Sequence, residues 1–412
     1  MLRRALHIHT LPLVSGSGLN TLASMVLLRG HGFEAELACG PPPAEDRRGP
    51  GPADPPASLP ALARARGIAT HAVPHLTRAI NAPADLRAIV ELAGLIRRGG
   101  YAVVHTHNSK AGFLGRIAAR ACRVPAIVHT VHGWAFEQTG NAFARRFYRA
   151  AEQCAAPLAH RTILVSEALG ASAVRAGLPG AARRQVIYSG IDRAAFLNAR
   201  RDGGLRRDLG ADADSFLIGQ VAKLWHGKGH GTLLAAFRRV QRENPRARLV
   251  LVGEGPLRGE LSRAAHRLGL GHAVTFTGHR NDVPAVTAQL DAATLCSEYE
   301  GMGRVVIEAM AAGVPVVASR VGGISELVEE GRTGFLAPPG DARGFAERLS
   351  RLARNGELRA RMGRRARARA GKIYDEETMT AEIAAVYRSA LAHVRNSAPW
   401  ARASVLGNTP CT

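Results

Sequence analysis

Two glutamates, Glu300 and Glu308, stand eight positions apart on either side of a short glycine-containing segment. Residues 301–307 begin with two closely spaced glycines and continue as an apolar run, which predicts a tight turn followed by a helix. Glu300 would then lie on the turn, and Glu308 in the second turn of the helix. The amides of residues 303–305 would open the helix and could bind a phosphate anion. Two acidic acceptors beside a phosphate-binding turn match the chemistry that a nucleotide sugar requires.

Two lysines, Lys223 and Lys228, follow a predicted strand at residues 216–221 and precede a predicted helix at residues 232–240. In open α/β sheets such a loop lies at the carboxyl end of the strand, where ligands bind. The chain has four lysines among 55 basic residues, so a plain surface charge would be expected to be arginine. A lysine ammonium suits the charge that develops on a departing phosphate. We therefore interpret the pair as a diphosphate clamp, although its spacing is not that of a Walker A loop.

Four other residues could contact a ligand, and each has a plainer structural alternative. Gly18 ends a glycine–serine loop that would let the backbone approach a ligand closely, although such a loop is common. Lys110 could contact an acceptor phosphate, whereas His105 just before it is in strand register and is expected to be packed. His132 ends another strand beside a glycine, which leaves space, but a lone histidine is usually structural. Arg280 could meet phosphate or simply be an exposed charge.

The chain is strongly basic, with a formal net charge of +22. This charge could attract membrane headgroups, nucleic acid or phosphorylated ligands, or it could be a solvated arginine-rich surface. Residues 142–156 predict a basic, aromatic helix that could lie against anionic lipid or turn an apolar stripe to the core. No RNA-binding or helix-turn-helix signature accompanies the charge, so no nucleic-acid partner is expected.

Cysteine usage and hydropathy bear on metal binding and location. The five cysteines are scattered without a C-x-x-C pair, and the histidines share no metal-ligand spacing with carboxylates. We expect no metal, no cofactor, and a reducing compartment. The N-terminal arginines and apolar residues predict a first strand rather than a signal peptide, and no apolar run is long enough to span a bilayer. The expected location is the cytoplasm, with any membrane contact peripheral, on the inner face of the cytoplasmic membrane.

Strand-like and helix-like patterns alternate along the 412 residues, which is typical of parallel sheets covered by helices. The length favours two domains. The predicted fold class is therefore α/β, with two Rossmann-like domains facing across a cleft. The predicted boundaries are an N-terminal domain at 1–195, a C-terminal domain at 196–375, a helix at 376–395 that returns to the N-terminal domain, and a loose tail at 396–412.

Several segments resemble the family 4 glycosyltransferases, retaining enzymes of the GT-B fold that use nucleotide-diphospho-sugars. The strongest is the E-x7-E pair in the run EGMGRVVIEAMAAGVPVV at 300–317. Supporting runs are VHTHNSKAG at 104–112, HTVHGWAF at 129–136, VIYSGID at 186–192, VGGISELV at 321–328 and GRTGFLAPPGD at 331–341. The resemblance extends over about residues 6–391, and its motifs are specific in combination.

The resemblance implies a donor site in the C-terminal domain and an acceptor site in the N-terminal domain. Glu308 would hold the hydroxyls of the donor ribose, and Glu300 would contact the transferred sugar. Lys223 and Lys228 would neutralise the diphosphate. The turn residues that complete the expected donor site are Met302, Gly303, Arg304 and Val305.

From the other domain, the resemblance implies that His132 lies beside the transferred sugar and that Gly18 borders the phosphates. The chain departs from the family pattern at three places. Lysine stands at position 223 where arginine is common, Met302 stands where phenylalanine or leucine is frequent, and Ser17 stands where a glycine is usual. The first change keeps the charge but loses the two-pronged arginine geometry.

The activity implied is that of a hexosyltransferase. Its donor would be a UDP- or GDP-linked sugar, and its acceptor a sugar or a lipid-linked sugar used in cell-envelope, exopolysaccharide or lipopolysaccharide assembly. One alternative is a nucleotide-sugar epimerase, which can share the GT-B architecture. Another is a non-catalytic protein that binds nucleotide sugars or anions, against which the intact glutamate and lysine pairs argue.

Overall fold

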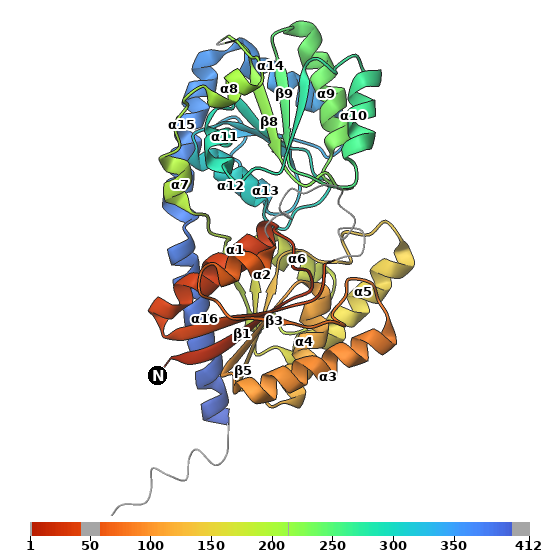
Figure 1. The fold of residues 1–412 in the computed structure, drawn as a ribbon, viewed down its shortest axis with the longest axis vertical. Helices are drawn as coiled ribbons and strands as arrows, with labels where there is room; N and C mark the ends of the chain where they lie inside the picture. The colour runs from red at the N-terminus through yellow and green to blue at the C-terminus, as the bar shows by residue number, and fades with distance from the viewer. Residues whose placement is uncertain (1, 43–57, 213, 398–412) are drawn as a thin grey trace, which may run out of the picture. The chain divides into compact units, whose positions relative to one another are not determined.

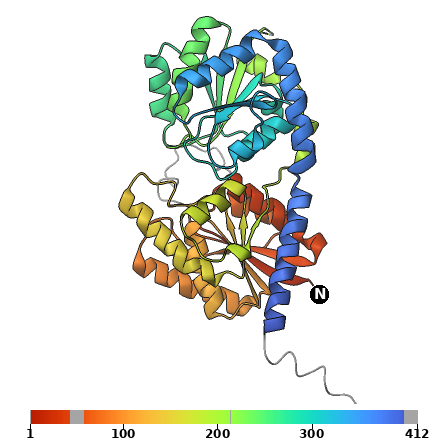
Figure 2. The ribbon, with the colours of Figure 1, turned by 180° about the vertical axis from the view of Figure 1, so that it is seen from behind.

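The computed structural model describes residues 2–42, 58–212 and 214–397. The chain divides into two compact units: unit 1 holds the described residues of Met1–Val165, Leu169–Ile187 and Glu377–Thr412, and unit 2 those of Ser166–Ala168 and Tyr188–Glu376. Each unit has one parallel sheet with helices on both faces (Figures 1 and 2). This confirms the predicted α/β class. Most of the expected loose tail, residues 398–412, lies outside the described part of the chain.

Unit 1 is built on a seven-stranded parallel sheet with the order β3-β2-β1-β4-β5-β6-β7. The direction in which the chain adds strands reverses between the neighbours β1 and β4, so the carboxyl ends of these two strands form a topological switch point. The strands are β1 (Arg3–His9), β2 (Phe33–Cys39), β3 (Thr70–Ala72), β4 (Val103–His107), β5 (Ala126–Val131), β6 (Arg161–Leu164) and β7 (Arg184–Val186).

Two apolar layers enclose this sheet, because successive side chains of a strand point to opposite faces. Leu6 and Ile8 of β1 pack with α3 and α4, whereas Ala5 packs with α1, α2 and α16. Helix α16 contributes Met379 and Tyr387 to this second layer, and the Tyr387 ring meets Phe33 edge-on at 5.1 Å. The helices are α1 (Gly16–Leu27), α2 (Leu59–Arg64), α3 (Ala82–Gly99), α4 (Ser109–Ala121), α5 (Ala142–Ala155), α6 (Glu167–Arg175) and α16 (Glu376–Ser397).

Unit 2 repeats the architecture with a six-stranded parallel sheet of order β10-β9-β8-β11-β12-β13. The strands are β8 (Leu217–Val221), β9 (Arg248–Val252), β10 (Val274–Gly278), β11 (Ala292–Leu295), β12 (Val316–Ser319) and β13 (Gly334–Ala337). The helices are α7 (Arg193–Leu197), α8 (Gly204–Asp208), α9 (His230–Glu243), α10 (Arg258–Arg267), α11 (Val283–Ala288), α12 (Arg304–Ala311), α13 (Ile324–Leu327), α14 (Ala342–Arg354) and α15 (Gly356–Ile373).

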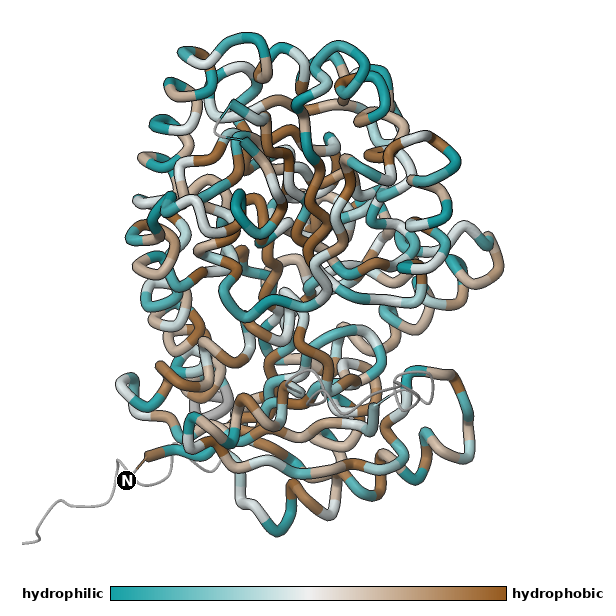
Figure 3. Tube along the Cα trace, turned by 45° about the horizontal axis from the view of Figure 1, so that its top comes forward, coloured by the Kyte–Doolittle hydropathy of each residue, from teal (hydrophilic) through white to brown (hydrophobic). Residues whose placement is uncertain are grey.

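Apart from the edge strand β10, the strands of unit 2 are buried on both faces, and their hydrophobic colour stands out at the centre of this unit in Figure 3. Continuous apolar runs are what a parallel sheet covered by helices requires. The switch point of this sheet lies between β8 and β11. The loop after β8 carries both predicted lysines, and the segment after β11 carries both predicted glutamates, so the topology gathers them at one edge of the sheet.

Candidate active site

The centre of the site in unit 2 is a contact between Lys228 and Glu300. The Lys228 ammonium donates to Oε1 of Glu300 at 2.5 Å, and the Ser297 hydroxyl donates to the same oxygen at 2.8 Å. The Glu300 side chain is 15% exposed and that of Lys228 is 33% exposed. The pair is therefore screened from bulk water but still reachable by a ligand.

The loop after β8 is fixed to the end of β11, which sets the position of Lys228. Gly229 has a φ of 68°, and a Cβ at this residue would lie 1.8 Å from the carbonyl oxygen of Cys296, so only glycine fits. The Gln220 amide donates to the carbonyl of Lys228 at 3.1 Å, and the Glu298 amide donates to that of Gly227 at 2.9 Å. Lys228 is thus presented by a rigid loop.

Helix α12 begins beside this pair. Gly303, the N-cap residue just before the helix, has a φ of 84°, and the first helical hydrogen bond runs from the Val306 amide to the Gly303 carbonyl at 2.8 Å. The amides of residues 303–305 therefore precede the helical hydrogen bonds and stand at the positive end of the helix dipole. Met302, just before the turn, is 4% exposed and packs beneath it rather than facing solvent.

Glu308 is buried inside unit 2, and it is held by an ion pair that the sequence does not predict. Arg304 Nε donates to Glu308 Oε1 at 3.1 Å, one helical turn away. Burial raises the pKa of the Glu308 carboxyl, while the Arg304 charge acts in the opposite direction. Glu308 also lines a small cavity with Thr287 and Thr294. The rest of the lining is mostly apolar, so Glu308 is an acidic acceptor in a largely apolar interior.

The other predicted cations lie in separate environments. The Lys223 ammonium stands 5.1 Å from the centre of the Trp225 ring, a cation–π distance. Lys110 forms an ion pair with Asp85 at 2.6 Å. Arg280 donates through two nitrogens to Asp282 at 2.7 and 2.5 Å.

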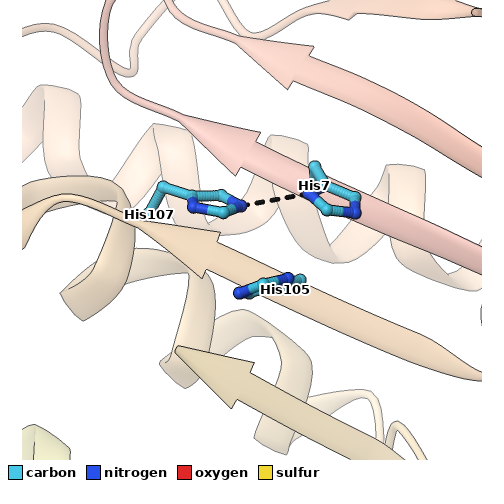
Figure 4. Close-up of side chains that lie close together, drawn as sticks. All are labelled: His7, His105 and His107. Atoms are coloured by element: carbon cyan, nitrogen blue, oxygen red, sulfur yellow. Dashed lines mark hydrogen bonds between the residues drawn. The ribbon is translucent and has the colours of Figure 1, made fainter. Parts of the chain in front are cut away.

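In unit 1, His132 belongs to a cluster of histidines at the switch point between β1 and β4. Its Nε2 lies 3.2 Å from Nδ1 of His107, whose Nε2 lies 3.0 Å from Nδ1 of His7. His9 joins through Thr21, whose hydroxyl oxygen lies 3.0 Å from His9 Nε2 and 3.3 Å from His107 Nδ1. Figure 4 shows His7, His105 and His107 on two adjacent strands.

The cluster is electrically neutral at ordinary pH. Burial lowers the pKa of His7 and His9 to about 3 and that of His132 to about 4. Burial, with smaller effects of neighbouring histidines, lowers the pKa of His105 and His107 well below the usual value. Neutral imidazoles can donate and accept hydrogen bonds at once, so the cluster can hold polar ligands without adding charge.

Sequence spacing did not indicate that these histidines meet. The ring nitrogens lie within 4.8 Å of one another in each of two groups of three histidines, His7/His105/His107 and His9/His107/His132. Three histidines are a set of ligands that binds zinc in other proteins. The histidines come from strands that are neighbours in the sheet but distant in the sequence, so sequence spacing does not reveal the cluster. The signal was present as H-x-H at the carboxyl ends of two strands.

Gly18 lies near the start of α1. Its amide donates to the Ser15 hydroxyl at 3.2 Å, the N-terminal capping bond of this helix. A Cβ at Gly18 would approach the Leu13 carbonyl oxygen to 3.1 Å. A glycine therefore suits the close backbone approach in this loop.

Two units, each with a parallel sheet covered by helices, define a two-domain α/β enzyme of the GT-B type. Residues 15–190 match the glycosyl transferase 4-like domain, and residues 204–369 match the glycosyl transferases group 1. The chain is 30% identical over 351 residues to the UDP-Gal:α-D-GlcNAc-diphosphoundecaprenol α-1,3-galactosyltransferase of Escherichia coli, covering 84% of this chain and 87% of that protein. The chain belongs to the family 4 glycosyltransferases.

Other comparisons agree. The chain is 30% identical to N-acetyl-α-D-glucosaminyl L-malate synthase of Bacillus anthracis over 213 residues, 52% of this chain and 55% of that one. A crystal structure of the Anabaena protein HepE with UDP and glucose aligns with a TM-score of 0.79 at 25% identity, covering 94% of this chain and all of that one. None of these relatives is named as an epimerase, and the chain is a glycosyltransferase. No helix in residues 2–42, 58–212 or 214–397 is both long and apolar enough to cross a bilayer.

Proposed function

We propose that this enzyme moves a hexose from a UDP-linked donor to a lipid-linked sugar acceptor, with retention of configuration at the anomeric carbon. The observation that carries the donor part is the Lys228–Glu300 contact beside the N-terminus of α12. The Anabaena structures contain UDP or UDP-glucose, and the Escherichia coli relative is named for UDP-Gal and a diphosphoundecaprenol-linked sugar. These names favour UDP over GDP and a lipid-linked over a free acceptor.

In the proposed complex, the donor diphosphate lies between the Lys228 ammonium and the amides of residues 303–305. Lys228 exchanges part of its contact with Glu300 for a phosphate oxygen, so one anionic partner replaces another and the ammonium is never left unpaired. Glu300 then accepts a hydrogen bond from the transferred sugar. Lys223, on the same loop, supplies a second cation. Fixed cations stabilise the charge that grows on the departing diphosphate.

The same pocket would recognise the nucleoside through Glu308. Its carboxylate, oriented by Arg304, accepts hydrogen bonds from the two adjacent hydroxyls of the ribose. Val305 and Gly303 contribute backbone amides, and Met302 supports the turn from below. The burial of Glu308 strengthens these contacts because a low local dielectric favours hydrogen bonds to a charged acceptor.

The transfer itself needs no protein nucleophile in this proposal. The bond between the anomeric carbon and the phosphate oxygen breaks, and a bond to the acceptor oxygen forms on the same face of the sugar. The proton of the acceptor hydroxyl passes to the departing phosphate oxygen, so charge and atoms balance. The transition state has oxocarbenium character, as in glycosyl transfer generally.

Unit 1 would supply the remaining contacts. His132 lies beside the transferred sugar in this proposal, and Gly18 lets the α1 loop approach the phosphates. Lys110 of unit 1 and Arg280 of unit 2 are secondary candidates for binding phosphate, because the acceptor or donor would first have to displace Asp85 or Asp282.

Nucleotide release from UDP-, GDP-, ADP- and CMP-linked sugars tests the donor assignment. Lys228→Ala should lower kcat by about 10²–10³-fold, the loss that follows removal of one preorganised donor. Glu308→Ala should chiefly raise the KM for the donor. Lys372→Ala, which removes an exposed lysine of α15, is the matched control and should leave both constants unchanged. Undiminished turnover in both site variants would refute the assignment.

We also propose that helix α5 carries the enzyme to anionic lipid, where a lipid-linked acceptor resides. Phe143 is 81% exposed and Phe147 is 48% exposed, and Arg145, Arg146 and Arg149 are exposed among them. Exposure of large aromatic side chains to water is unfavourable, and insertion into the membrane interface removes it. Arginines beside them can bind lipid phosphates. Together they support a peripheral association by this helix.

Flotation with vesicles of phosphatidylglycerol and phosphatidylcholine tests the membrane proposal. The wild type should float with anionic vesicles at low salt and less so at high salt, because the arginine contribution is screened. The double variant Phe143→Ser/Phe147→Ser should stay at the bottom. Val174→Ser, which removes a 68% exposed apolar side chain of α6, should float like the wild type. Equal flotation of all three proteins would exclude α5 as the contact.

A further inference from the structure

A pair of buried polar side chains, Gln220 and His230, lies behind the loop that carries both lysines of the proposed diphosphate clamp. Gln220 lies near the end of β8 and His230 is the first residue of α9, so the pair stands on either side of this loop. Both residues are at most 3% exposed. Their polar atoms are therefore available to the loop and not to solvent.

Main-chain partners fix the orientation of the Gln220 side-chain amide. The Cys296 amide, which can only donate, lies 3.2 Å from Oε1 of Gln220, and the Lys228 carbonyl, which can only accept, lies 3.1 Å from Nε2. The opposite orientation would set donor against donor at Cys296 and acceptor against acceptor at Lys228. Nε2 of Gln220 is therefore the NH2 group.

This orientation determines where His230 carries its proton. Nδ1 of His230 lies 2.9 Å from Nε2 of Gln220 and must accept, so the single proton of the neutral ring is on Nε2, which donates to the Lys223 carbonyl at 3.0 Å. Burial lowers the pKa of His230; the bond to Lys223 opposes this shift and the charge of Lys228 adds to it. A second proton, on Nδ1, would point at the donor group of Gln220.

The pair ties both lysines of the loop to one point beside the neighbouring strand β11. It bonds the main-chain carbonyl of each lysine, and it is bonded in turn by the amide of Cys296, the residue that follows β11. Ser297 comes next and donates to Glu300 at 2.8 Å, so one path of covalent and hydrogen bonds spaces the two cations from the acidic acceptor. A loop that is fixed in advance loses less entropy when a ligand binds.

We propose that Gln220 and His230 are positioning residues, which hold the main chain of the loop so that both of its lysines meet the donor diphosphate. The inference rests on the proposed role of these lysines in donor binding. A lysine side chain is long and flexible, so the place of its ammonium group depends on a fixed main chain. Neither residue of the pair touches the donor, and its loss should weaken the binding of the diphosphate but not that of the nucleoside.

Binding of UDP and of uridine, compared by NMR titration, separates positioning from a purely structural role. Gln220→Met keeps the length of the side chain and removes the amide. It should weaken UDP binding about 10- to 100-fold, the range expected when buried polar partners are left unsatisfied, and leave uridine binding unchanged. Gln289→Met is the matched control, because it removes another buried glutamine amide of unit 2, which bonds the main chain at Leu205 and Ala285. The control should lose thermal stability without weaker UDP binding.

Two substitutions of His230 provide a second test. His230→Phe removes both ring nitrogens, whereas the side-chain amide of His230→Gln can still donate to the Lys223 carbonyl. His230→Phe should weaken UDP binding about as much as Gln220→Met does, and His230→Gln should recover most of this loss. Unchanged UDP binding in folded Gln220→Met and His230→Phe, or an equal loss of uridine binding, would overturn the proposal.

Nitrogen-15 NMR of the histidine rings examines the pair in the wild type without a ligand. The His230 signals are identified by their loss in His230→Gln, and at pH 7.5 we expect a protonated Nε2 and an unprotonated Nδ1. A protonated Nδ1 would overturn the proposal even where a variant fails to fold. The two proposals fail separately. A wild type that binds pyrophosphate but no nucleotide sugar would sink the proposed function alone, and the variants would then be compared with pyrophosphate.

Discussion

Lowering the pH from 7.5 to 5.5 should strongly destabilise unit 1. Five histidines of its interior are at most 2% exposed and are held neutral by burial, which lowers the pKa of each below the usual value. They are His7, His9, His105, His107 and His129. In the unfolded chain the same side chains titrate near the ordinary pKa of about 6.5.

The sign follows from proton binding. Between pH 7.5 and 5.5 the unfolded state takes up protons that the folded state refuses, so the free energy of unfolding falls as the pH falls. For His7 or His9, with an unfolded pKa of about 6.5 and a folded pKa of about 3, the loss over this interval is roughly 1–2 kcal/mol. The two together lose about 3 kcal/mol, against a total stability of roughly 5–15 kcal/mol for a domain. Burial lowers the pKa of His105, His107 and His129 in the same direction, so these residues add to the loss.

Urea unfolding at a series of pH values measures the effect. Trp134, which is 4% exposed in unit 1, reports on this unit by fluorescence once Trp225 and Trp400 are replaced by phenylalanine. The expected result is a steep fall in the free energy of unfolding as the pH falls below about 6.5. A change of less than about 2 kcal/mol between pH 7.5 and 5.5 would refute the reasoning.

A single substitution refines the test. His129→Gln should make the pH dependence shallower, whatever it does to the stability at pH 7.5, because one of the protonation events of the buried histidines is lost. His393→Gln, which replaces an exposed histidine of α16, should leave the slope of the wild type. If both variants kept the full slope, the buried histidines would not be its source.

Two further predictions concern unit 2. Asp291 is 6% exposed and accepts hydrogen bonds from Arg206 at 2.6 Å, Arg201 at 2.7 Å and the Leu217 amide at 2.8 Å. Asp291→Asn should therefore lower the free energy of unfolding, measured in urea, by about 3–5 kcal/mol. The same change at Asp214, whose side chain is 80% exposed, should cost less than about 1 kcal/mol, and equal losses would contradict the argument. Gly229→Ala should displace the Lys228 loop and lower kcat about as much as Lys228→Ala does, and a fully active, equally stable protein would contradict this.

The fold could be predicted wherever strands are buried on both faces. The run at residues 216–221 was expected as a strand and contains β8 (Leu217–Val221), because a parallel sheet between helices leaves a continuous apolar signature. The edge strands β3 (Thr70–Ala72) and β13 (Gly334–Ala337) were not predicted. They have three or four residues, too few for a period to appear, and neighbours in space rather than local sequence define them.

The parts of the site that follow directly from the ends of strands could be predicted from the sequence. Glu300 and Lys228 each follow a central strand, and topology brings such residues together at a switch point. The partners of individual side chains were not predictable. Arg304 and Glu308 share a helix, but each side chain could adopt other rotamers. The hydrogen bond between Tyr387 and His7 joins residues that are 380 positions apart. Such contacts depend on packing, which the local sequence does not encode.

The two switch points differ in charge, and this difference bears on which ligand each unit would hold. Unit 2 places the Lys228 ammonium and the open amides of α12 at its sheet edge, which suits a diphosphate. Unit 1 places imidazoles at its own edge, and burial keeps them neutral despite the net charge of +22. Neutral donors suit sugar hydroxyls, since a charged group would lose hydration without gaining an opposite charge. The contrast supports donor binding through unit 2 and acceptor binding through unit 1.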